Sequence, residues 1–248
     1  MPAARRDNAM VLIAVSGSPD SDSRTATNDL LRGLRTGRWH PPAWGRFLGR
    51  AGLRSWEQAR ARPRALAEVT ALHATLAVLG CRHRWRWAVA SWALAVTHLG
   101  MLESQCSLGI ANVLTLTRAN LPVTATATGD GRVLGVLALI SDLADGRLAR
   151  RLGTVTPFGR DADSIADAAF WTWFALRHEP NRVLRILALG AWAVPVATVI
   201  AISVGRGGMA DPPRPEIARP AAAMQALLTA RALMRGSRIR AAGAPPLR

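Results

Sequence analysis

The chain has 248 residues, half of them hydrophobic, and its formal net charge is +16 at pH 7. A charge of this sign favours an anionic partner, which is either nucleic acid or an anionic lipid surface. The long apolar stretches favour the lipid surface, because a nucleic-acid-binding domain has no use for them, and we expect no nucleic-acid partner.

The N-terminal part of the chain divides into two segments of different character. Residues 1–40 are rich in polar side chains and arginine, and we predict a disordered basic and polar tail there. The segment 41–63 mixes arginines with apolar side chains that recur roughly at helical spacing, namely Trp44, Phe47, Leu48 and Leu53. This pattern predicts an amphipathic helix on the membrane surface. A soluble helix packed against the rest of the domain is the alternative.

Six apolar stretches follow, at 65–80, 85–101, 108–128, 133–148, 158–176 and 183–204. Several fall short of the roughly 20 residues that usually cross a bilayer. Helices that shelter polar groups against their neighbours can still cross, so we predict a transmembrane domain over 64–206. The expected fold is an all-α, polytopic membrane helix bundle of about six transmembrane helices, preceded by the amphipathic surface helix. The first two stretches either cross as a pair or form a shallow re-entrant hairpin.

The C-terminal segment, 207–248, is basic, and we expect a tail that contains at most a partial helix over 220–235. Four spans from residue 108 onward place this tail and the acidic segment 142–167 on one side of the membrane. Because arginine-rich segments stay on the cytoplasmic side, we expect an integral protein of the cell membrane whose site faces the cytoplasm.

Four aspartates beside these apolar stretches form the most informative pattern in the chain. Asp142 and Asp145 are three residues apart, and Asp163 and Asp167 are four apart, so each pair shares one face of a helix. Two facing helices would bring four carboxylates into one small volume, where negative charges need a cationic partner. Carboxylate oxygens are the ligands that Mg²⁺ and Mn²⁺ prefer. The spacing therefore predicts a site for one of these metals, with two ions expected.

Small residues complete the pattern, which in full reads D-x2-D-G-x2-A-R-x8-G-x3-D-x3-D from Asp142 to Asp167. It resembles the signature of the CDP-alcohol phosphatidyltransferase family at all of its fixed positions. The upstream run of Asn112, Thr115 and Arg118 is similar to one that opens the first core helix in many members. Together the resemblance covers roughly residues 109–205. Members usually have six helices from that run onward, whereas this sequence has four clear ones.

The resemblance implies an enzyme of phospholipid biosynthesis that displaces CMP from a CDP-linked donor, usually CDP-diacylglycerol, by attack of an alcohol hydroxyl. It implies that Asp142, Asp145 and Asp163 bind metal, and that Asp167 is the general base and also contacts metal. The residues expected to lie against the nucleotide of the donor are Gly146, Ala149, Arg150 and Gly159. Membrane lipids are expected partners, and many members are homodimers.

Three residues of the first core helix keep two interpretations each. Arg118 lies within an apolar stretch, where a charge is costly, so it either contacts a substrate phosphate or forms an ion pair with one of the aspartates. Asn112 and Thr115 either orient the site and the acceptor or cap the start of a helix.

Two other classes of function compete with the transferase. A membrane transporter also places carboxylates inside a helix bundle, and an inactive scaffold would keep the fold without the chemistry. For the transferase we expect glycerol-3-phosphate as the acceptor, because abundant arginines suit an anionic substrate. Inositol phosphate, another polar alcohol and phosphatidylglycerol stay open as acceptors.

Overall fold

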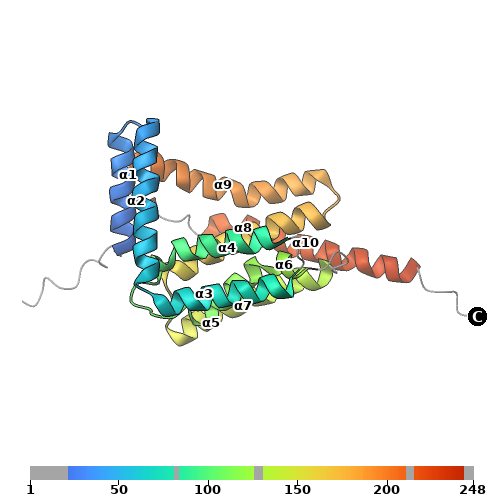
Figure 1. Ribbon diagram of the computed structural model, residues 1–248. Coiled ribbons are helices and arrows are strands. Elements are labelled where there is room, and N and C mark those ends of the chain that lie inside the picture. Colours follow the sequence, from blue (N-terminus) through green and yellow to red (C-terminus); the bar gives the residue numbers. More distant parts are fainter. Residues whose placement is uncertain (1–21, 81–83, 126–130, 211–214, 243–248) are drawn as a thin grey trace, which may run out of the picture.

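The computed structural model describes residues 22–80, 84–125, 131–210 and 215–242, which form an all-helical protein with no strand in these ranges. Figure 1 shows a bundle of roughly aligned helices with the first two helices lying across one end. The elements are α1 (Asp22–Thr36), α2 (Pro41–Arg60), α3 (Pro63–Leu79), α4 (Trp85–Thr97), the 3₁₀ helix η2 (Leu99–Leu102), α5 (Gly109–Ala119), α6 (Leu121–Thr124), α7 (Gly131–Leu152), α8 (Pro157–His178), α9 (Arg182–Arg206) and α10 (Pro215–Ala242).

Helix α1 departs from the predicted disordered tail over 1–40, of which residues 1–21 lie outside the described ranges. It packs against α2, and Leu31 and Leu34 are buried. The guanidinium of Arg35 also donates to the carbonyl oxygen of Arg206 at the end of α9, at 2.7 Å. Two buried leucines and a hydrogen bond to the end of a distant helix therefore hold in place a segment whose composition is that of a tail.

Helix α2 forms where the amphipathic helix was predicted, over 41–60 of the segment 41–63. Its large apolar side chains remain exposed on the outer face of the α1–α2 pair: Trp44, Leu48, Leu53 and Trp56. Exposed indole rings beside arginines suit the boundary between lipid and water. Its position on a membrane surface stays a prediction.

Five of the six apolar stretches form single helices, α3, α4, α7, α8 and α9, although α4 is followed by η2 within its stretch. The stretch 108–128 instead breaks into α5 and α6, because Pro122 begins a new short helix after Asn120 ends α5. Within the described residues one helix, Arg182–Arg206, is long and apolar enough by itself to cross a membrane. The count of six spans stays a prediction. Helices α3 and α4 pack against each other, an arrangement that fits both a pair of crossing helices and a re-entrant hairpin.

The bundle core has two apolar clusters that meet along α8. One lies among α2, α3, α4, α5 and η2 and includes Val69, Leu99, Leu102 and Phe158. The other lies among α7, α8, α9 and α10 and includes Phe170, Trp171 and Phe174. Phe170 and Trp171 pack edge to face with ring centroids 5.0 Å apart. Between the clusters, α5 packs against both α7 and α8, so the first core helix is central.

Helix α10 replaces the predicted tail over 207–248 with 28 residues of helix, packed mainly on α7. Leu228, Thr229 and Ala232 are buried. Gly135 of α7 allows this approach, because an added Cβ there would lie 3.0 Å from Thr229 Oγ1. Residues 211–214 and 243–248 lie outside the described ranges.

Glu179, in the loop between α8 and α9, ties α10 to the far end of α8. Its side chain is 1% exposed and accepts hydrogen bonds from Arg231 Nε at 2.9 Å and Arg235 Nη1 at 3.1 Å. Burial would raise the pKa of Glu179, but Arg231, the backbone N–H of Asn181 and Arg235 outweigh it and lower the pKa from 4.5 to about 2. Arg231 and Arg235 thus lie near the end of α8, away from Asp163 near its start, and the side of the membrane on which the C-terminal segment lies stays a prediction.

We predict that Glu179→Gln destabilises the protein by about 2–4 kcal/mol, because it leaves two arginines beside a neutral buried amide. The folded pKa lies below the unfolded one. The stabilisation by Glu179 is therefore complete above pH 4.5 and is lost as the pH falls toward 2.

Thermal unfolding in detergent at pH 7 and pH 3.5 measures both effects. The same substitution at the exposed Glu57 of α2 is the matched control. Equal melting temperatures for the Glu179 and Glu57 variants at pH 7 would contradict the assigned role of Glu179.

Candidate functional site

The four aspartates of the sequence pattern converge between α7 and α8. Asp142 and Asp145 lie on α7, and Asp163 and Asp167 lie on α8 after the turn that joins the two helices. Thr156 fixes the start of α8, since its Oγ1 accepts a hydrogen bond from the N–H of Gly159 at 3.1 Å. Carboxylate oxygens of Asp142, Asp145 and Asp163 lie within 4.8 Å of one another. The helical spacing and the short connection therefore bring these three side chains to one place.

Arg118 of α5 lies at the centre of all four carboxylates and is 1% exposed. Its Nη1 is 3.0 Å from Asp142 Oδ1 and 3.0 Å from Asp145 Oδ2. Its Nη2 pairs with Asp163, and its Nε is 3.1 Å from Asp167 Oδ1. The structure thus shows the ion-pair interpretation of Arg118, with four partners instead of one. The phosphate contact stays a prediction.

The donor set fits a divalent cation. One guanidinium balances only one of four ionised carboxylates, and the remaining negative charge is the kind that hard cations neutralise. Asp142, Asp145 and Asp163 supply oxygen atoms alone, which suits Mg²⁺ or Mn²⁺ better than softer metals. Asp167 is not part of this close group, so its expected contact with metal stays a prediction.

Thr115 and Asn112 of α5 line the cavity beside the aspartates and do not cap the helix, and their role in orienting the site or the acceptor stays a prediction. Thr115 Oγ1 donates to Asp145 Oδ2 at 2.8 Å, and Asn112 Nδ2 donates to the carbonyl oxygen of Leu108 at 2.7 Å. The residue that precedes α5 is Leu108, with no side-chain cap. The capping interpretation is therefore wrong for both residues.

A cavity of about 280 Å³ opens beside the carboxylates. Its wall includes the four residues expected to face a nucleotide, Gly146, Ala149, Arg150 and Gly159, together with Asp145 and Asp163. A Cβ added at Gly159 would lie 2.7 Å from Asn112 Oδ1, so a larger residue there would force the Asn112 side chain to move. The small residues of the pattern thus create space next to the charged group.

Polar residues of the site that were not found from the sequence include Arg160, Gln225, Thr154 and Thr156. Arg160 lines the same cavity but occupies a variable position of the pattern. Gln225 of α10 donates from Nε2 to Asp167 Oδ2 at 2.9 Å. It belongs to a segment rich in Ala, Leu and Arg, and no local motif indicates a contact with a residue 58 positions away.

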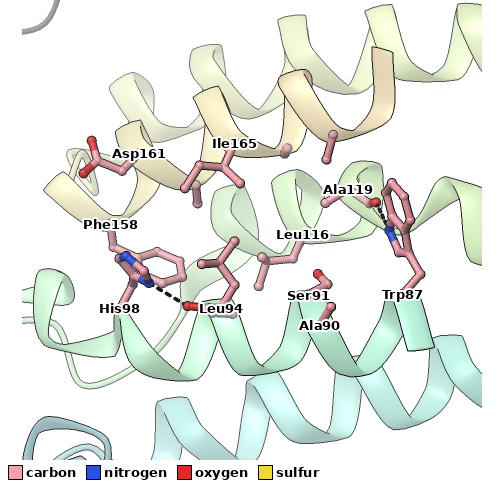
Figure 2. Close-up of a pocket in the computed structure, with 14 residues that line it drawn as sticks. Trp87, Ala90, Ser91, Leu94, His98, Leu116, Ala119, Phe158, Asp161 and Ile165 are labelled. Carbon is pink, nitrogen blue, oxygen red and sulfur yellow. Dashed lines mark hydrogen bonds between the residues drawn. The ribbon is translucent and has the colours of Figure 1, made fainter. Parts of the chain in front are cut away.

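A second cavity, of about 260 Å³, lies on another face of α8, between α8, α4 and α5 (Figure 2). Its wall is mostly apolar, and Asp161 and His98 lie toward one end. Asp161 therefore points away from the group that holds Asp163, as expected from its position off the shared helix face. This cavity lacks the convergent carboxylates of the first one.

Comparison with known proteins identifies the region that holds the site. The sequence profile of the family described as CDP-alcohol phosphatidyltransferase matches residues 108–234, half of the chain. The match spans Arg118, all four aspartates and Gln225. No curated protein and no solved structure matches the chain.

We predict that Asp163→Asn weakens Mn²⁺ binding at least about tenfold, because it removes one of three convergent carboxylates. Electron paramagnetic resonance of free Mn²⁺, titrated with purified protein, measures the affinity. Asp161→Asn, two residues away on the same helix, is the matched control and should leave binding unchanged. Equal losses in both variants would show that the binding is not confined to this group.

We also predict that Arg118→Met lowers stability by about 3–5 kcal/mol without divalent ions, because four carboxylates lose their shared counter-charge. Added Mn²⁺ should raise the melting temperature of this variant more than that of the wild type. Arg150→Met, which removes a guanidinium from the cavity wall, is the control. Identical metal-induced shifts in wild type and Arg118→Met would contradict the idea that arginine and metal balance the same charges.

Proposed function

Because the chain belongs to the CDP-alcohol phosphatidyltransferase family, we propose that it transfers a phosphatidyl or related substituted phosphate group from a CDP-linked donor to an alcohol and releases CMP. CDP-diacylglycerol is the donor we propose. The observation that carries this proposal is the convergence of the aspartates beside a cavity walled by Gly146, Ala149 and Gly159. A nucleoside diphosphate bound in this cavity would lie next to the carboxylates.

In this mechanism the acceptor oxygen forms a bond to the donor phosphorus as the bond between that phosphorus and the bridging oxygen of CMP breaks. Divalent ions at Asp142, Asp145 and Asp163 would supply positive charge for the phosphates. Asp167 accepts the proton of the acceptor hydroxyl, and its side chain is 19% exposed, so a substrate can approach it. Arg118, which is not part of the cavity wall, holds the carboxylates in place through its ion pairs. Positioning and charge supply most of the rate, as in other phosphoryl transfers.

The acceptor we propose is glycerol-3-phosphate. Arg150 and Arg160 both line the cavity, so a substrate with a second phosphate gains charge-assisted hydrogen bonds there. Inositol phosphate would use the same groups. A neutral polar alcohol has no phosphate to bind Arg150 or Arg160. Phosphatidylglycerol carries its phosphate between two glycerol units, so it offers these arginines no terminal phosphate.

We further propose that the protein is integral to the cell membrane and that the site faces the cytoplasm. Helix α9 is apolar and mostly exposed, which suits contact with lipid. The arginines of α2 and Arg206 lie at the end of the bundle crossed by α1 and α2, together with the start of α8 (Figure 1). Positive charge at this end favours the cytoplasmic side.

We predict metal-dependent release of CMP when the purified protein meets CDP-diacylglycerol, glycerol-3-phosphate and Mn²⁺ or Mg²⁺ in lipid micelles. Asp142→Asn should reduce the rate about a hundredfold or more, because it removes a ligand from the charged group. Asp161→Asn should retain the rate of the wild type.

A panel of acceptors tests the second part of the proposal. Product with inositol phosphate and none with glycerol-3-phosphate would replace our acceptor and keep the reaction class. No CMP with any acceptor, from folded protein that binds Mn²⁺, would contradict the transferase itself and favour a scaffold or a transporter.

A further inference from the structure

Gln225 is a buried amide from the C-terminal helix that contacts the carboxylate assigned to proton transfer. We propose that it is a positioning residue for Asp167, and that α10 thereby completes the catalytic site. This inference rests on the proposed function, since it concerns the base of that reaction. It assigns a role to a residue outside the aspartate pattern.

The carboxylate of Asp167 is held at both oxygens from two different helices. Gln225 Nε2 donates to Oδ2 at 2.9 Å, and Arg118 Nε lies 3.1 Å from Oδ1. A carboxylate has about four lone-pair sites, so each oxygen keeps further capacity to accept a proton. Oδ1 and Arg118 Nε form an ion pair but no hydrogen bond, so the hydrogen bond from Gln225 sets the direction of the carboxylate. Gln225 therefore sets how Asp167 presents itself to the acceptor hydroxyl.

The amide itself is firmly placed. Gln225 is 6% exposed, so its hydrogen bond competes little with water. One helical turn later, Thr229 is buried, and its Oγ1 donates to the backbone carbonyl oxygen of Gln225 at 2.9 Å. Arg231 and Arg235 then anchor the helix to Glu179. Packing on α7 and α9 and the ion pairs with Glu179 thus fix the position of α10, so that a residue on it can hold a side chain of the site.

Gln225→Met tests the role, because methionine has a similar length but no N–H donor. We expect kcat to fall roughly tenfold to a hundredfold, since a small misplacement of a catalytic group costs about that much. The KM for CDP-diacylglycerol should change less than about twofold, because the nucleotide cavity does not include Gln225. Leu227→Ala, on the exposed side of α10, is the control and should retain the kcat of the wild type.

A double-mutant cycle separates positioning from packing. In an Asp167→Asn background, which itself lowers kcat, Gln225→Met should cause no further loss, because the group on which it acts is gone. Gln225→Leu, which is apolar and also lacks the N–H donor, serves if the methionine variant does not fold; it should lower kcat in the same way.

Three results would overturn the inference: an unchanged kcat in a folded Gln225 variant, a loss confined to the KM of the donor, or losses that add in the Asp167→Asn background. The failure of the proposed function has a different signature. In that case the wild-type protein itself releases no CMP with any acceptor, whereas an active wild type beside an equally active Gln225→Met removes only the role of Gln225.

Discussion

The burial of Arg118 among four carboxylates is the constraint on which the rest of the structure depends. A guanidinium cannot stay 1% exposed without anionic partners, and four carboxylates cannot converge without a cation. These partners come from α7 and α8, so the three helices α5, α7 and α8 can only pack together in one register. The same charge excess that makes the group dependent on Arg118 suits it to hold a divalent cation. Stability and chemistry therefore share one set of side chains.

The helices around this group are shaped by small residues more than by large ones. Gly159 brings α8 against Asn112, and Gly135 brings α7 against Thr229. The approach at Gly159 lies beside the cavity next to the carboxylates. The approach at Gly135 allows α10 to pack on α7. Large aromatic side chains, such as Phe170 and Phe174, fill the cluster behind the site and keep α8 rigid. The polar face of α8 can thus hold Asp163 and Asp167 while its other faces are packed.

The parts of the structure that could be predicted from the sequence are those set by local spacing. Aspartates three and four residues apart had to share helix faces, and the small residues between them had to lie beside them. Contacts between distant segments leave no such trace. Helix α10 is Ala-rich and weakly amphipathic, and its burial depends on Gly135 and Glu179, each far away in the chain. Gln225 was missed for the same reason. Helix α1 was missed because the burial of Leu31 and Leu34 and the hydrogen bond from Arg35 to Arg206 outweigh its polar composition.

The burial of Arg118 separates its two interpretations. The ion pairs engage Nη1 with Asp142 and Asp145, Nη2 with Asp163, and Nε with Asp167. The side chain is fully buried and does not belong to the cavity wall, whereas its partners Asp145 and Asp163 do. These carboxylates therefore lie between the guanidinium and a phosphate in that cavity. Arg118 thus affects the cavity through the positions of the aspartates with which it pairs, which explains why a costly buried charge is placed where α5, α7 and α8 meet.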